Sequence, residues 1–573
     1  MAVESLTPYF FLAAYLLIFP ASLAVYRLCF HPLSKIPGPR LAAITPLWYA
    51  YHIRRSRLLL LGQELHNKYG PAVRIAPNEV QFNSKEAFQA IYGGMGYLQK
   101  SDFYYALSNN PGYIDWLLRR HPNDDGFAIN GELDIQRHRG HRKNIGTTYS
   151  AASVRKYGGA IDAVLRRFVA KLKTQEERTV ELAEWVHIAL VECISVVTLG
   201  LSPGFIDDGS DHGIWDVSVT KWRQISVFGF LPSLTLLVQK WPALKPAVAA
   251  LCGVPIRKPD GYVPFEQVRS LSPTPTFPKT SQILRRLQVL TPVQTMMQMI
   301  KERASRFFQS EKKPAPPNTD AEAETDILTE LLHLTTKKPG WKPHHAVGMA
   351  YINFIAGHET TTAITTAALA LICTNPGAKA RVVAEALEHD DAGADDVVGN
   401  CGAYTQACIK ETLRLRPVAS FSLSRIVPPA NVNTDGAGEG LRLHGYAIPA
   451  GTAVGVHVPA MHLNTEIFGP DAAAFRPERW LERGDEGPEL QMRKNLEKIS
   501  LAWGAGAHVC PGRNLAELIM GKLIPLLMRE FDVEVVAFPR VEDMATFNYL
   551  GFTTGVKVRF HVRRPEVRAG SDG

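Results

Sequence analysis

The sequence predicts a mainly α-helical protein with small β-sheets, an α+β fold built as a single large domain behind an N-terminal transmembrane helix. Three observations lead to this prediction. An uncharged apolar stretch lies near the N-terminus, helix-forming segments dominate the rest, and strand-like alternation is confined to two short segments. The 573 residues, 46% hydrophobic and 21% charged, can bury a large core, which excludes a mainly disordered chain.

The N-terminal stretch has the composition of a membrane span. Residues 9–26 carry no charged side chain, and the apolar run extends to Phe30; a helix needs about 20 such residues to cross the hydrocarbon core. A cleaved signal peptide would place basic residues before this run, but only Glu4 is charged there. Basic residues follow it instead: Arg27, Lys35, Arg40, Arg54, Arg55 and Arg57. We therefore expect residues 1–30 to be an uncleaved anchor that leaves the rest of the chain in the cytoplasm.

A proline-rich segment separates the anchor from the body of the protein. Residues 31–40, HPLSKIPGPR, contain three prolines, which fix their own φ and restrict the residue before them. This segment, residues 31–40, predicts a stiff hinge that sets the angle between the anchor and the remaining domain, residues 41–573.

Within the body, helical and strand-like segments can be told apart by their periodicity. Residues 153–173 and 291–309 have the pattern of amphipathic helices. Residues 71–82 and 441–458 alternate locally between apolar and polar side chains and are predicted to form strands. The polar residues 310–325 are predicted to be an exposed loop.

Charge and cysteine usage exclude several classes of protein. The formal charge of +8 favours an acidic partner or an anionic membrane, because no basic stripe with interleaved aromatics indicates nucleic-acid binding. The seven cysteines are scattered, odd in number and without a CxxC pair, so a disulfide framework or zinc site is not expected. Cys510 alone has a sequence context that indicates chemistry.

Cys510 lies in the segment AWGAGAHVCPGRNL. Gly504 and Gly506 allow the backbone to bend sharply and to approach a flat ligand closely. A helical apolar run begins near Asn514, and a thiolate just before a helix is stabilised by its N–H groups and dipole. This arrangement suits an anionic sulfur ligand to iron.

A second segment, residues 351–372, predicts a helix too apolar to lie on a surface. Gly357 costs about 1 kcal/mol relative to Ala inside a helix, so it should have a structural reason. The Thr360 hydroxyl can bond the carbonyl of Ala356, or it can serve a ligand instead. Glu359 adds an ionisable group to this helix, and such groups are seldom buried without a purpose.

A third and a fourth segment carry charges that fit one another. Glu411 and Arg414 are three residues apart in KETLRLRP and face the same way on a helix. Arg479 follows in the turn-rich FRPERW. We expect the three to form a buried, mutually satisfied cluster.

Taken together and in this order, the four segments resemble those of the cytochrome P450 family, in particular its microsomal fungal members. The resemblance extends from Pro37 to the strands near the C-terminus. It implies the cytochrome P450 fold, haem b as cofactor and Cys510 as the metal ligand. The family's cysteine loop, Phe-Gly-x-Gly-x-Arg-x-Cys-x-Gly, is matched here by Trp503, Gly504, Gly506, His508, Cys510 and Gly512.

Two of these positions depart from the family pattern. Trp503 replaces a Phe that packs beside the sulfur. His508 replaces an Arg that reaches a haem propionate, and histidine still donates a hydrogen bond but need not be charged at neutral pH.

The resemblance also assigns roles to residues outside the loop. The proton-relay motif is intact in Ala356, Gly357, Glu359 and Thr360. Three further residues resemble propionate ligands: His138, Arg142 and Arg425. The Glu411, Arg414 and Arg479 cluster is implied to be structural.

The function implied is that of a haem-dependent monooxygenase, which inserts one oxygen atom from O2 into a lipophilic small molecule, in secondary metabolism. Because the chain has no visible flavin or Rossmann domain, electrons are expected from NADPH through a partner reductase. That partner would meet a basic face: Arg137, Arg139, Arg142, Lys143 and Arg513. The expected location is the endoplasmic reticulum membrane, with a single span and a cytoplasmic catalytic domain.

Substrate contacts are expected from residues 354–360, 418–421 and 548–552, where the family's substrate-facing segments fall. Two alternatives stay open at this point. One is a haem-thiolate isomerase or dehydratase that uses neither O2 nor a reductase, and the other is a non-enzymatic haem- or sterol-binding protein. The intact Glu359–Thr360 pair favours the monooxygenase.

Overall fold

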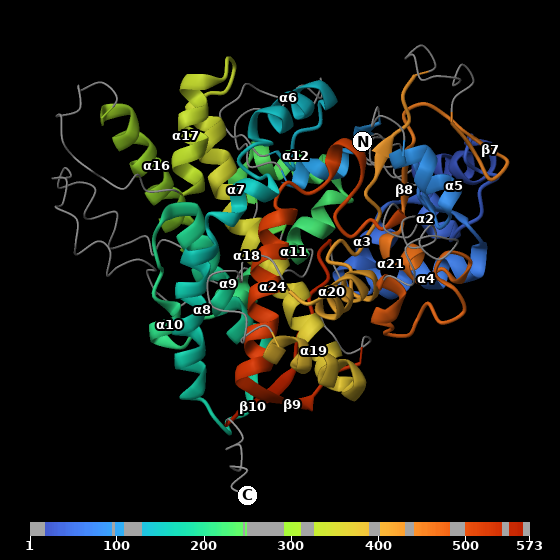
Figure 1. Cartoon of the computed structure of the whole chain (residues 1–573). Coiled ribbons are helices and arrows are strands. Elements are labelled where there is room, and N and C mark those ends of the chain that lie inside the picture. Colours follow the sequence, from blue (N-terminus) through green and yellow to red (C-terminus); the bar gives the residue numbers. More distant parts are fainter. Residues whose placement is uncertain are drawn as a thin grey trace, which may run out of the picture.

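The computed structural model describes residues 18–93, 98–107, 129–244, 247–248, 292–310, 326–388, 401–429, 441–481, 499–540 and 549–564. Over these ranges the chain is mainly helical and its strands form three small sheets. Figure 1 shows the long helices in the centre and on one side, with β7, β8 and the helices α2–α5 on the other. The predicted fold class is therefore confirmed for the body of the protein. The polar stretch predicted after residue 310 lies outside the described residues.

Two long helices form the centre of the core. α18 (Pro343–Thr374) packs against α9 (Leu182–Leu199). α9 is the one helix of the described part that is long and apolar enough to cross a membrane, but 89% of it is buried. A helix that is apolar all round belongs in the interior, and α9 is a core helix of this kind. The pair meets closely at Gly357, where an added Cβ would lie 3.0 Å from Cδ1 of Ile194. An alanine at position 357 would crowd Ile194, which is a structural reason for a glycine inside α18.

Other helices surround this pair. The longer ones are α8 (Gly158–Lys173), α11 (Ile214–Gly229), α16 (Pro292–Ser310), α19 (Pro376–Glu388), α20 (Ala403–Leu415) and α24 (Arg513–Glu530). The shorter ones are α2 (Arg40–Ile44), α3 (Leu47–Arg54), α4 (Leu58–Tyr69), α5 (Lys85–Phe88), α6 (Ile135–Ile145), α7 (Ala151–Arg155), α10 (Phe205–Asp208), α12 (Pro232–Lys240), α17 (Ile327–Lys337), α21 (Val458–His462) and α22 (Thr465–Phe468). Short 3₁₀ and π segments are η1 (Tyr26–Phe30), η2 (Gln89–Gly93), η3 (Asp102–Leu107), η4 (Pro242–Leu244), η6 (Pro477–Trp480) and η7 (Gly506–His508).

The helix predicted over residues 153–173 is divided into α7 and α8. The break falls just before Gly158 and Gly159, whose low helix propensity disfavours a continuous helix.

The strands form one five-stranded sheet and two smaller ones. The large sheet has the order β1 (Ala72–Ala76), β2 (Glu79–Phe82), β8 (Ala453–Val456), β5 (Arg425–Ile426) and β3 (Gln99–Lys100). A three-stranded sheet has the order β4 (Val180–Glu181), β10 (Lys557–Val562) and β9 (Phe531–Ala537). A two-stranded sheet is formed by β6 (Leu441–Leu443) and β7 (Tyr446–Ile448). Both predicted strand regions are thus confirmed. Pairing of β3 with β5 places Lys100 opposite Arg425, which brings two cations to one edge of the site.

The proline-rich segment is held firmly against the large sheet. It forms turns at residues 32–35, has no helix or strand from there to the start of α2, and buries Leu33 and Ile36. The backbone N–H of Arg74 donates to the carbonyl of Pro37 at 2.8 Å, and the Arg74 side chain donates to the carbonyl of Arg27. The end of the N-terminal helix is therefore fixed to the body.

Part of the predicted anchor is described. Residues 18–30 form a short apolar helix that ends in η1 and leaves large apolar side chains exposed: Ile18, Phe19, Val25, Tyr26 and Phe30. Residues 1–17, which hold the beginning of the predicted span, lie outside the described residues. The transmembrane helix stays a prediction.

Candidate active site

A cavity of about 310 Å³ lies at the centre of the molecule and is lined mainly by apolar side chains. Residues of α18 line it together with the cysteine loop that precedes α24. Its size falls within the range of small-molecule pockets, about 300–1,000 Å³. The cysteine loop and the α18 segment, two of the four segments singled out from the sequence, therefore meet at this cavity.

The cysteine loop is tightly folded before α24 begins at Arg513. Gly504 has φ +76°, and a Cβ added there would lie 2.8 Å from the carbonyl oxygen of His508. Gly506 has φ +59°, which also favours glycine. The N–H of Cys510 donates to the carbonyl of Trp503 at 2.8 Å and closes the loop. Both predicted glycines thus have a conformational reason.

Cys510 lines the cavity beside the start of α24. Burial raises the pKa of its thiol, while the backbone N–H groups of Gly512 and Arg513 and the charge of Arg142 act in the opposite direction. A cation bound to the sulfur would add to this stabilisation of the thiolate. The donor set suits a soft, anionic metal ligand.

One edge of the cavity gathers positive charge. Lys100, Arg142 and Arg425 line it together with His138 and His508. Nζ of Lys100 donates to two backbone carbonyls, at 3.2 and 3.0 Å. Burial and then the charge of Arg425 lower the pKa of Lys100 to about 7.

The two histidines at this edge have spare hydrogen-bonding capacity. Their rings lie 4.4 Å apart, and both ring nitrogens of His508 and Nδ1 of His138 are buried without a hydrogen-bond partner among the described residues. Burial and the charge of Lys100 lower the pKa of His138 to about 3; burial and the charge of Arg425 lower that of His508 further. Leaving such a buried polar atom unsatisfied costs about 1–3 kcal/mol. The positive charges and the unused histidine nitrogens at this edge together fit an anionic ligand group.

These residues fit the haem that the sequence resemblance implies. Cys510 would bind the iron, and Lys100, Arg142, Arg425, His138 and His508 would bind the propionates. Lys100 was not singled out from the sequence. It follows a short stretch without a motif, and only its pairing with Arg425 across the sheet shows its place at the site.

Three of the four predicted relay residues on α18 line the cavity, and Glu359 does not. Ala356, Gly357 and Thr360 line the cavity, and the Thr360 hydroxyl donates to the carbonyl of Ala356 at 2.6 Å. Glu359 is 2% exposed and is not among the residues that line the cavity. Its carboxylate accepts a hydrogen bond from the indole N–H of Trp222, a partner that sequence reasoning did not find.

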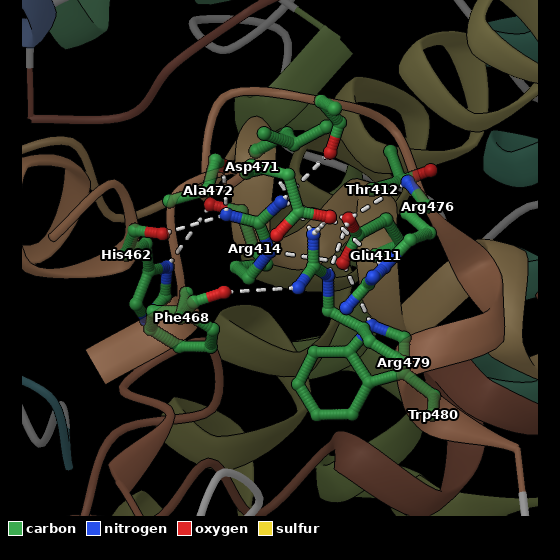
Figure 2. A network of polar contacts seen from close by, with 12 residues as sticks. Glu411, Thr412, Arg414, His462, Phe468, Asp471, Ala472, Arg476, Arg479 and Trp480 are labelled. Atoms are coloured by element: carbon green, nitrogen blue, oxygen red, sulfur yellow. Dashed lines mark hydrogen bonds and ion pairs between the residues drawn. The ribbon is translucent and has the colours of Figure 1, made fainter. Parts of the chain in front are cut away.

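The predicted charge cluster is assembled as expected, and Figure 2 shows its contacts. Arg414 donates to both carboxylate oxygens of Glu411, at 2.9 and 2.7 Å, and Nε of Arg479 donates to Oε1 at 2.9 Å. Trp480 donates to Oε2 at 2.8 Å. Burial by itself would raise the pKa of Glu411, but the hydrogen bond and the charge of Arg414 hold it below its ordinary value. The cluster is thus a satisfied set of buried charges.

His462 connects this cluster to the cysteine loop. Its Nδ1 lies 3.1 Å from the carbonyl of Arg414, and its Nε2 accepts the N–H of Leu501 at 3.2 Å. Burial and the charge of Arg414 lower the pKa of His462 to about 3, so it is neutral. Leu501 lines the cavity just before Trp503.

Two of the predicted substrate segments lie side by side. The N–H of Gly551 donates to the carbonyl of Val418 at 2.7 Å, and Ala419 pairs with Leu550. Val418, Ala419, Tyr549 and Leu550 line the cavity. Phe354 is not among the lining residues and packs on His358 instead. Asn548 lies outside the described residues.

Comparisons with known proteins give one family model and several relatives that are similar to this chain. The family model described as cytochrome P450 matches residues 265–557. The cytochrome P450 monooxygenase sdnT of Sordaria araneosa is 37% identical and covers 98% of this chain and 97% of its own length. The cytochrome P450 monooxygenase gsfF of Penicillium aethiopicum is 29% identical over 94% of this chain and 95% of its own. A pisatin demethylase of Fusarium vanettenii is 28% identical over 89% and 85%.

Proposed function

Because this chain belongs to the cytochrome P450 family and is a monooxygenase, we propose that Cys510 binds its haem b and that the cavity takes a lipophilic small molecule. The observation that carries the proposal is the cavity shared by Cys510, the cationic edge and Thr360. The reaction belongs to secondary metabolism, and its overall product is a substrate carrying one oxygen atom from O2.

Bound haem supplies the iron that activates O2, and a thiolate ligand favours cleavage of the O–O bond. The chain's own residues do the rest. Lys100, Arg142 and Arg425 would hold the propionates, and the apolar walls of the cavity would exclude water. The Thr360 hydroxyl, with Glu359 and water, would supply protons to the cavity.

The substrate class follows from the lining of the cavity. Apolar side chains from α18, from residues 418–423 and from residues 549–550 dominate it. A terpenoid, polyketide or indole-derived molecule fits such a surface. The demethylation named for one relative describes that relative alone.

We propose that electrons come from NADPH through a membrane-bound reductase. Arg142 lines the cavity, so the basic face for this partner consists of Arg137, Arg139, Lys143 and Arg513. Two of these already have a carboxylate partner on this chain: Arg137 pairs with Glu132 and Arg513 with Glu517. The face is thus less strongly positive than the sequence suggests.

Attachment to the endoplasmic reticulum membrane, through residues 1–30 and with residues 41–573 as a cytoplasmic catalytic domain, belongs to the same proposal. Exposed apolar side chains support it beyond the anchor. They are Leu41, Leu47 and Tyr51 near the hinge and Leu237, Trp241 and Leu244 in or next to α12 and η4. α3 and α12 both pack against α11.

Expression in microsomes with a reductase tests the proposal. The reduced protein should give a thiolate-type carbon monoxide difference spectrum, and Cys510→Ala should abolish it. NADPH-dependent O2 uptake distinguishes the monooxygenase from an isomerase or dehydratase. Thr360→Ala should keep the spectrum but divert consumed O2 to H2O2, whereas a non-enzymatic binder would show no catalytic change.

A further inference from the structure

Glu359 points toward α11 instead of the cavity. Oε2 of its carboxylate accepts the indole N–H of Trp222, which is 6% exposed and 137 positions earlier in the chain. Its neighbours Gly357 and Thr360 line the cavity, but Glu359 does not. The group assigned to proton delivery is therefore held by a residue of another helix.

The indole is itself fixed in place. The Trp222 ring is stacked on Tyr549, with ring centres 5.6 Å apart and planes at 11°. The N–H of Tyr549 donates to Oγ of Ser226 at 2.7 Å, and that hydroxyl donates to the carbonyl of Trp222 at 2.6 Å. Tyr549 lines the cavity, so the contacts run from the cavity wall through Trp222 to Glu359.

A second connection ties the start of α11 to the residue beside Glu359. Asp211 accepts the N–H of Trp215 at 2.9 Å and so satisfies a backbone donor in the first turn of α11. The same oxygen lies 2.8 Å from Nδ1 of His187, whose Nε2 lies 3.0 Å from Nδ1 of His358. Asp211 and both histidines are at most 2% exposed. α11 is thus connected to α18 in two places, through Trp222 and through the contacts of Asp211, His187 and His358.

The chemistry of a relay explains why such a contact matters. A buried carboxylate is stable only with hydrogen-bond donors, and its flexible side chain otherwise adopts several rotamers. Displacing a reacting group by about 1 Å can cost about a hundredfold in rate. A donor that selects one rotamer therefore affects each proton transfer through that carboxylate.

We propose that Trp222 is a positioning residue for the proton relay, and that its indole N–H fixes the Glu359 carboxylate relative to Thr360. The inference rests on the proposed function. Productive turnover converts R–H, O2, NADPH and H⁺ into R–OH, H2O and NADP⁺. Without substrate, O2, NADPH and H⁺ give H2O2 and NADP⁺, or a second NADPH and H⁺ reduce the oxygen to two H2O. Both the productive and the water-forming reactions consume protons that the relay supplies.

The test compares Trp222→Phe with Trp185→Phe in the full chain with reductase, NADPH and O2. Phe at 222 keeps a stacking ring but removes the N–H. Trp185 is equally buried, packs on Phe168 and has no hydrogen bond to Glu359 in the described structure. We expect Trp222→Phe to slow NADPH oxidation roughly tenfold and to raise the solvent deuterium isotope effect, and we expect the same two changes in Glu359→Gln. Trp185→Phe should resemble the wild type.

Two further measurements separate positioning from a purely structural role. Combined with Glu359→Gln, Trp222→Phe should cause no additional loss, because both changes remove the same function. The infrared stretching band of carbon monoxide on the reduced protein should shift in Trp222→Phe and not in Trp185→Phe. If Trp222→Phe folds poorly, Trp222→His keeps an N–H donor and should restore part of the rate.

An unchanged rate in Trp222→Phe, or a loss that adds to that of Glu359→Gln, would overturn the inference. The proposed function fails differently, through a wild-type protein that gives no thiolate-type carbon monoxide spectrum or consumes no O2 with NADPH.

Discussion

Lys100 illustrates how a single buried charge indicates what binds next to it. The side chain is 5% exposed, and burial lowers its pKa to about 7. It lies opposite Arg425 in the sheet, so a second cation adds to the cost of charging it. A buried lysine is stable at this position if an anionic ligand group offsets its charge and that of Arg425.

We predict that Lys100→Met weakens haem retention, because it removes a charge-assisted hydrogen bond worth about 1.5–3 kcal/mol. Haem transfer to apomyoglobin should become roughly tenfold to a hundredfold faster. Lys100→Arg should lie close to the wild type. Lys68→Met, which removes an exposed lysine on α4, serves as the control. Equal transfer rates in Lys100→Met and Lys68→Met would remove Lys100 from the propionate site.

At the scale of elements, the charge cluster joins α20 to η6 and to the segment after α21. Arg414 is 1% exposed and donates to the carbonyls of His462 and Ala472 as well as to Glu411. Through His462 the same set of contacts reaches Leu501 at the entrance to the cysteine loop. The cluster therefore positions the loop that carries Cys510.

Arg414→Lys should destabilise the protein by about 3–5 kcal/mol, the usual cost of breaking a buried ion pair. Lysine keeps the charge but cannot reproduce the planar fork that contacts both oxygens of Glu411. The urea midpoint should fall, and the fraction of purified protein that carries haem should fall with it. Arg381→Lys is the matched control, since Arg381 forms a half-exposed pair with Glu478. If both variants had the same urea midpoint, the buried cluster would contribute no more to stability than the half-exposed pair.

Contacts of the site between residues close together in the sequence were easier to predict than contacts between distant residues. The cysteine loop and the Gly357–Thr360 turn of α18 were predictable, because neighbouring residues determine their conformation. The three charged residues of the cluster were also found, since buried charges require partners. The Trp222–Glu359 hydrogen bond joins residues 137 positions apart and leaves no local pattern. Lys100 likewise takes its meaning from the sheet pairing with Arg425 alone.

At the scale of the whole molecule, buried neutral histidines make stability depend on pH. His457 and His462 are fully buried, and burial, more than any neighbouring charge, lowers the pKa of each from 6.5 to about 3. Between these values the unfolded chain binds protons that the folded chain does not. Stability is therefore complete above about pH 6.5 and is lost as the pH falls toward about 3.

We predict a loss of about 2 kcal/mol per histidine between about pH 7 and pH 5, measured as the free energy of unfolding in urea. His457→Gln combined with His462→Gln should lower stability at neutral pH, because both side chains hold backbone groups. The same double variant should flatten the dependence on pH by about 4 kcal/mol over that interval. A slope equal to that of the wild type would show that other groups control acid unfolding.

The surface charge of the molecule indicates where the electron donor docks. α6 carries His138 and Arg142 toward the cavity, whereas Arg137 and Lys143 are exposed on the same helix. An acidic partner attracted to this helix would approach the edge of the site where the propionates bind. Complementary charge mainly accelerates association, and salt screens it.

Arg139→Glu combined with Lys143→Glu should therefore slow reduction by the reductase several-fold at low salt and much less at high salt. The carbon monoxide spectrum should not change, and Lys68→Glu, an equivalent change of charge on α4, should leave reduction unaltered. A partner that docks elsewhere would give equal rates for all variants at low salt.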